Sequence, residues 1–178
     1  TLAISSAASD VYKRQYWAWA DQYITELTMP KLGPERSNWL YPIGSILKTG
    51  AVVAFGSDWF VTSGNPMLGI ETAITRKDPL TNISDDFLMH ERISLADAIA
   101  AYTINGAYVN FMEDESGSIE VGKYADLIVI DRNLFKIPET EISEANVVLT
   151  MLDGEMIYGS WDMKVLEKLS LIHISEPT

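Results

Sequence analysis

One acidic side chain, Asp58, stands where the sequence pattern places enzyme chemistry. It ends the motif Gly56-Ser57-Asp58, directly after a short uninterrupted apolar run at residues 51–55. Such a run predicts a parallel strand buried on both faces. A carboxylate at the C-terminal end of a barrel strand points into the mouth where barrel enzymes carry out their reactions. There it can bind a metal ion, or take a proton from water and pass it to a departing nitrogen.

The alternative for Asp58 is structural, because aspartate side chains also cap the turn that follows them. The tripeptide alone leaves both interpretations open. Trp59 and Phe60 come next, and two aromatic rings at this place could wall a substrate pocket or pack against neighbouring barrel loops.

Other polar residues have a simpler explanation than catalysis. Arg76 and Lys77 end a predicted helix, where cations suit the helix dipole, although they could also meet an acidic substrate group. His90 is expected to be an exposed loop residue. Asp126 precedes a predicted strand, which favours a turn or backbone-capping role.

The segments around Asp58 alternate in the way that a barrel requires. Apolar spacing predicts a helix at 35–49 that is interrupted at Pro42 or starts late there, before the strand at 51–55. A short helix at 67–77 follows, and Ser94 to Asp97 fits the capped start of a last helix that extends to about residue 111. Helix, strand and helix in this order indicate an α/β fold, specifically part of a (β/α)8 barrel.

The C-terminal part changes to strand patterns. Apolar runs predict strands at 117–121, 125–131, 147–152 and 155–158. Asp153-Gly154 between the last two is a strong hairpin signal. We expect these strands to form a small β-sandwich beside the barrel segment.

Both ends of the chain differ from the rest. Residues 10–15 and 169–174 can be encoded by complementary strands of one DNA element, so the ends resemble translated sequencing-library adapter. Genuine tails are the alternative. We therefore expect non-native tails at 1–15 and 169–178, a barrel segment at 16–112 and a β-sandwich segment at 113–168. That core of about 150 residues is shorter than a complete barrel of about 250 residues, which indicates a piece of a larger protein.

Composition narrows the possible partners. The formal net charge is −12 and the pI is about 4.4, which argues against nucleic acid or an anionic membrane as partner. The chain has no cysteine, so disulfides, thiolate zinc sites and a cysteine nucleophile are excluded. No apolar run reaches the roughly 18 residues of a membrane span. We expect a soluble protein, with the cytoplasm favoured as its compartment, and a small-molecule substrate.

Several motifs, taken in their order, resemble those of family-3 amidohydrolases, the group that includes deacylase-like and formamide-deformylase-like enzymes. The motifs are Leu32-Gly33-Pro34-Glu35-Arg36, Tyr41-Pro42, Phe55-Gly56-Ser57-Asp58-Trp59, Asn65-Pro66, Leu68-Gly69-Ile70, the segment 102–107 and the segment 117–131.

The resemblance implies the C-terminal part of a metal-dependent barrel hydrolase with a β-sandwich. Asp58 then matches the strand-eight aspartate that binds metal or acts as general base. The other ligands of a divalent metal, with zinc favoured, are histidines and a bridging lysine or glutamate on earlier strands, and no such residues match here. We therefore expect the parent protein to hydrolyse C–N bonds other than peptide bonds, and the fragment alone to be inactive. A ring deaminase and a non-catalytic scaffold are the alternatives, and the oligomeric state stays open.

Overall fold

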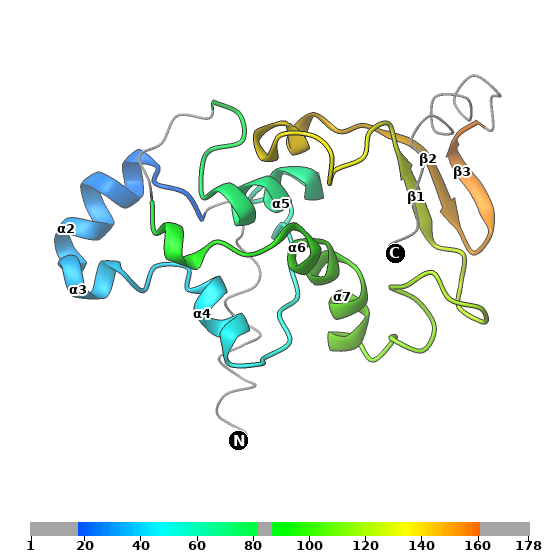
Figure 1. The fold of residues 1–178 in the computed structure, drawn as a ribbon, viewed down its shortest axis with the longest axis horizontal. Helices are drawn as coiled ribbons and strands as arrows, with labels where there is room; N and C mark the ends of the chain where they lie inside the picture. The colour runs from blue at the N-terminus through cyan, green and yellow to red at the C-terminus, as the bar shows by residue number, and fades with distance from the viewer. Residues whose placement is uncertain (1–17, 82–86, 161–178) are drawn as a thin grey trace.

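The computed structural model describes residues 18–81 and 87–160, and Figure 1 shows short helices joined by irregular segments, with a small sheet at one end. The predicted non-native tails at 1–15 and 169–178 lie outside the described residues. The elements in chain order are η2 (Tyr23–Thr28), α2 (Met29–Leu32), α3 (Pro34–Ser37), α4 (Ile43–Lys48), α5 (Pro66–Thr75), η3 (Met89–Glu91), α6 (Leu95–Tyr102), α7 (Ile104–Val109), β1 (Leu127–Ile130), η4 (Glu139–Glu144), β2 (Val147–Leu152) and β3 (Glu155–Gly159). None of the described helices is long and apolar enough to cross a membrane.

The helices start where local sequence signals place them. Asn65 caps α5 by accepting a hydrogen bond from the Met67 N–H at 3.0 Å, and proline occupies the first turn. The interruption predicted at Pro42 is confirmed, since α3 ends at Ser37 and α4 begins at Ile43. Short-range capping chemistry is therefore a reliable guide in this part of the chain.

The predicted last helix is two helices. Its start is confirmed, because the Ser94 hydroxyl accepts a hydrogen bond from the Asp97 N–H at 3.1 Å. Its continuity is wrong, because Thr103 leaves helical geometry at φ −121° and ψ −100°, which ends α6 and begins α7. The Ala101 carbonyl accepts instead from the Phe55 N–H at 2.8 Å. This tertiary hydrogen bond thus occupies a carbonyl that would accept a hydrogen bond within the helix if the helix were continuous.

The strand predicted at 51–55 is wrong for the described structure. Residues 51–57 adopt no regular secondary structure, and no strand forms anywhere within the described part of 18–112. A parallel strand needs a neighbour that accepts and donates along its edge, and this part of the chain supplies none. The described residues therefore do not themselves close a barrel.

The C-terminal segment forms one antiparallel sheet in the order β1-β2-β3. The predicted hairpin is confirmed, since Asp153 and Gly154 join β2 to β3 and both have positive φ, 49° and 78°, as a type I′ turn requires. Asp126 has the predicted capping role, because its carboxylate accepts from the Asp153 N–H at 2.8 Å.

The strand predicted at 117–121 is also wrong. Ile119 and Val121 are almost fully exposed, and no described strand lies alongside to pair with this segment. The described C-terminal residues thus form a single sheet rather than a two-layer sandwich.

Two apolar clusters form the core. The larger joins α5, α6 and the η4 region, with Ile74, Ala98 and Ile142 among its most buried members. The smaller surrounds Val53, and Phe55 packs against both clusters. The segment that leads to Asp58 is therefore anchored where the two clusters meet.

Candidate active site around Asp58

Asp58 begins a tight turn that leads away from the core. Its backbone is left-handed, with φ 53°, and its carbonyl accepts a hydrogen bond from the Val61 N–H at 2.8 Å. The Thr62 hydroxyl donates to the Ser57 carbonyl and closes the same turn. Left-handed backbone is uncommon outside glycine but is tolerated by aspartate. The turn thus fixes the main chain on both sides of the Asp58 side chain.

The carboxylate of Asp58 is partly buried and has no partner among the described residues. No hydrogen bond or ion pair to it is present in 18–81 or 87–160. The turn-capping alternative would require a main-chain N–H bonded to this carboxylate, and the turn uses the Asp58 carbonyl instead. The acid is therefore left available for a ligand.

The aromatic neighbours of Asp58 lie in solvent. Trp59 is 75% exposed and Phe60 is 85% exposed. In the described structure these rings therefore neither wall a pocket nor pack against a second loop.

The described residues do not form a metal site. No group of three or more histidine, cysteine, aspartate or glutamate residues in 18–81 and 87–160 could hold an ion. A catalytic zinc takes about three protein ligands, and Asp58 supplies at most one. The metal that the family implies therefore does not fit the described residues alone.

His90 belongs to a different cluster: it is exposed, as predicted, but it lies in the short helix η3 rather than in a loop. Its side chain is 55% exposed, and its Nε2 lies 3.5 Å from Oε1 of the buried Glu91 carboxylate. Glu91 accepts from the Ser45 N–H at 2.7 Å and from the Ser45 hydroxyl at 2.5 Å. These bonds tie η3 to α4, which is a structural role.

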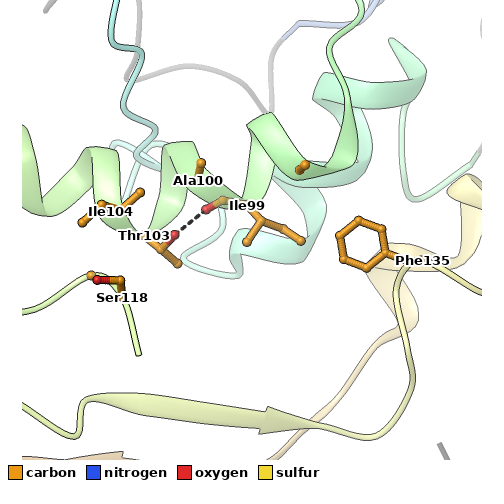
Figure 2. A pocket seen from close by; sticks show the side chains of 8 residues that line it. Ile99, Ala100, Thr103, Ile104, Ser118 and Phe135 are labelled. Atoms are coloured by element: carbon orange, nitrogen blue, oxygen red, sulfur yellow. Dashed lines mark hydrogen bonds between the residues drawn. The ribbon is translucent and has the colours of Figure 1, made fainter. Parts of the chain in front are cut away.

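Two neighbouring cavities of the described structure lie away from Asp58. Figure 2 shows an apolar cavity of about 380 Å³ between the α6–α7 junction, Ser118 and Phe135. The Thr103 hydroxyl at its wall is occupied, since it donates to the Ile99 carbonyl at 2.8 Å. A neighbouring cavity of about 780 Å³ extends toward β1 and β2, and Asp58 lines neither. These spaces therefore add no group to the candidate site.

Arg76 contributes to the fold in a way that the sequence did not suggest. Its side chain is fully buried, and its guanidinium donates to the Leu40 and Tyr41 carbonyls at 3.3 and 3.2 Å. It also lies 5.3 Å from the Phe87 ring centre. Burial lowers the pKa of Arg76 to about 10. The helix-dipole explanation is therefore too simple, because Arg76 also joins the end of α5 to the 40–41 turn.

Glu71 is a buried residue that none of the sequence predictions named. It is fully buried on α5, where its Oε2 accepts from the Ser143 N–H at 2.7 Å and its Oε1 has no partner among the described residues. A signal was present, since Glu71 shares the apolar i, i+3, i+4, i+7 stripe with Met67, Ile70 and Ile74. A charged residue on such a stripe predicts a buried carboxyl group.

Known proteins resemble this chain over most of its length. It is 36% identical over 129 residues to the protein LONG AFTER FAR-RED 3 of Arabidopsis thaliana. This match covers 72% of the chain and 22% of that protein. It is 33% identical over 119 residues to an N-substituted formamide deformylase of Arthrobacter pascens, and the match covers 67% of this chain and 21% of the deformylase. A 5'-deoxyadenosine deaminase of Methanobrevibacter smithii is 28% identical over 137 residues, and the match covers 71% of this chain and 31% of the deaminase. The chain thus spans less than a third of each relative.

The family assignment rests on a broader match than any one relative. The model of the amidohydrolase family matches residues 14–158, a range that includes the Asp58 turn, both core clusters and the sheet. The resemblance that the sequence motifs indicated is therefore confirmed, and the chain belongs to the amidohydrolase family.

Proposed function

We propose that this chain is a C-terminal segment of a larger enzyme that hydrolyses C–N bonds other than peptide bonds, with Asp58 as its proton-transfer residue. The observation that carries the proposal is the partly buried Asp58 carboxylate, which has no partner among the described residues, in a chain of the amidohydrolase family. The name of the Arthrobacter relative, a formamide deformylase, supports amide hydrolysis. Residues 16–112 would then complete a (β/α)8 barrel and residues 113–168 a β-sandwich, once the remaining polypeptide is present.

The chemistry of Asp58 follows from its type and placement. A carboxylate can accept a proton from the attacking water and later deliver it to the departing nitrogen, provided that both lie within hydrogen-bond reach. Because its carboxylate makes no competing bond in the described structure, Asp58 keeps its acceptor capacity for this task. Trp59 and Phe60 are exposed in the described structure. In the full-length protein, loops of the remaining polypeptide would enclose these two rings, which would then line the substrate site.

The metal requirement is part of the proposal for the full-length protein. A divalent metal, zinc in the first place, supplies carbonyl polarisation and an acidified water in hydrolases of this kind. Its ligands must come mostly from residues outside the described part of the chain, since that part holds no ligand cluster. This is why we expect the isolated chain to be inactive.

A ring deaminase is the second candidate. The Methanobrevibacter relative, a 5'-deoxyadenosine deaminase, favours it, and the same proton transfers would release ammonia from a ring carbon. Amide hydrolysis releases a carboxylate and the substituted amine, so the products separate the two candidates. A non-catalytic scaffold would release neither.

The test is product analysis on the full-length protein. It is incubated with N-substituted formamides and, separately, with aminopurine nucleosides, before and after treatment with a chelator. We expect formate release that the chelator abolishes and that added zinc restores. Ammonia release from the nucleosides would favour the deaminase, and the absence of either product at every metal tested would favour the scaffold.

A further inference from the structure

The segment that carries Asp58 has no strand partner among the described residues, yet two hydrogen bonds to its main chain hold it, one with a main-chain carbonyl and one with a side-chain amide. The Phe55 N–H donates to the Ala101 carbonyl at 2.8 Å. The Val53 carbonyl accepts from the side-chain amide of Asn105, also at 2.8 Å. Both partners lie at the α6–α7 junction, so one short region fixes the main chain shortly before Asp58.

The break at Thr103 makes both bonds possible. In a continuous helix the Ala101 carbonyl would accept from the N–H of residue 105. The break frees that carbonyl for Phe55 and places Asn105 in the first turn of α7. The rings of Phe55 and Tyr102 meet edge to face, with their centres 5.4 Å apart, and add an apolar contact at the same junction.

The far side of Asp58 is fixed by its own turn, through the bond from the Val61 N–H to the Asp58 carbonyl. The only residues between the junction contacts and Asp58 are Gly56 and Ser57. Apart from its chain neighbours, no described residue lies within 4 Å of where a Cβ on Gly56 would stand. The junction contacts therefore hold the main chain before Asp58, and the bond from the Thr62 hydroxyl to the Ser57 carbonyl ties the next residues to the turn.

We propose that Asn105 is a positioning residue for Asp58, acting through the Val53 carbonyl; this inference rests on the proposed role of Asp58. Asn105 does not touch the reacting atoms. Its amide supplies the donor that a neighbouring strand would supply in a regular sheet, so its loss lets the 53–58 segment shift relative to the rest of the site. A shift of about 1 Å at a catalytic group can cost about 100-fold in rate.

The chain offers a matched control. Asn110 also donates its side-chain amide to a carbonyl, that of Gly106, at 2.8 Å. That bond stays within the α7 region and is exposed. Asn105→Ala and Asn110→Ala therefore remove the same kind of hydrogen bond, but only the first releases the Asp58 segment.

The first measurement is kinetic and uses the full-length protein. Asn105→Ala should lower kcat by about 10- to 100-fold with little change in KM, whereas Asn110→Ala should leave both unchanged. Adding Asn105→Ala to Asp58→Asn should cause no further loss, because a residue that acts through another is not additive with it. Additive losses, or an unchanged kcat in Asn105→Ala, would overturn the inference.

The second measurement does not depend on activity. In the full-length protein, Asn105→Ala should speed hydrogen exchange of the Phe55 amide by about tenfold or more, and Asn110→Ala should not. Unchanged exchange in Asn105→Ala would refute the positioning role even where Asp58→Asn is inactive. If exchange is faster in Asn105→Ala but Asp58→Asn is fully active, Asp58 is not the proton-transfer residue. The Asn105 contact would then hold the segment without a role in catalysis.

Discussion

Three carboxylates show how partners decide what an acidic residue does here. Glu91 is buried and bonded by both polar groups of Ser45. Glu71 is equally buried, but one of its oxygens has no partner among the described residues. Asp58 is partly exposed and unpartnered within the same described part of the chain. Only Asp58 combines access with spare acceptor capacity, which is what general base catalysis needs.

Glu71 leads to a prediction about pH. Burial raises its pKa above the ordinary value of 4.5, and the hydrogen bonds from Ser143 only partly oppose this effect. The folded chain therefore retains a proton that the unfolded chain releases. The free energy of unfolding should fall as the pH rises from about 4.5 through the raised pKa, and should level off above it. Chemical denaturation at a series of pH values measures this slope.

Glu71→Gln is the control for that slope, because glutamine does not ionise. At pH 7 we expect the variant to be more stable than the parent chain by about 1 kcal/mol, since it removes an incompletely bonded buried charge. The pH dependence above 4.5 should shrink in the variant. A variant with the same slope as the parent would show that Glu71 is not the titrating group.

At the residue scale, the sequence could locate Asp58 but not its surroundings. The motif Gly56-Ser57-Asp58 after an apolar run is a local pattern. By contrast, the partners of Arg76 are carbonyls about 35 residues earlier in the chain, and the buried carboxyl of Glu71 meets Ser143 much later. No local spacing encodes such contacts, although the apolar stripe around Glu71 indicates that its carboxyl group is buried.

At the scale of the elements, two glycines separate backbone strain from steric crowding. Gly117 and Gly50 have similar positive φ values, 86° and 80°. A Cβ on Gly117 would lie 2.7 Å from the Ala107 Cβ, whereas nothing lies within 4 Å of one on Gly50. Gly50→Ala should cost about 1 kcal/mol of stability from the left-handed backbone, and Gly117→Ala about 3 kcal/mol because crowding is added. Thermal unfolding of both variants checks the difference, and equal costs would mean that the loop at Gly117 does not pack on α7.

The elements that could be predicted are those that local chemistry specifies. The Asn65 and Ser94 caps, the break at Pro42 and the Asp153-Gly154 hairpin all depend on residues a few positions apart. The strand expected at 51–55 failed because a parallel strand depends on distant partners. The break at Thr103 was missed for the same reason, since the Phe55 N–H competes for the Ala101 carbonyl.

At the scale of the whole molecule, apolar surface is left uncovered. Phe60, Phe111 and Ile119 are 85%, 92% and 90% exposed, so three large apolar side chains lie in solvent in the described structure. The relatives are several times longer than this chain. In a protein of that length, the remaining polypeptide could cover these exposed apolar side chains. This agrees with a segment of a larger barrel enzyme.

The exposed surface predicts the behaviour of the isolated chain. It should bind the dye ANS strongly and unfold with a broad transition, because apolar side chains are accessible before unfolding. The full-length protein should bind little dye under the same conditions. Weak dye binding and a sharp transition in the isolated chain would show that it forms a complete domain by itself.

The most direct test of the central claim compares two Asp→Asn variants of the full-length protein. Asp58→Asn removes the proposed proton acceptor, and Asp114→Asn makes the same chemical change at an exposed position. With the substrate that gives formate or ammonia, Asp58→Asn should lower kcat by about 100- to 10,000-fold without loss of folded protein, and Asp114→Asn should match the parent. Full activity in Asp58→Asn would contradict the account.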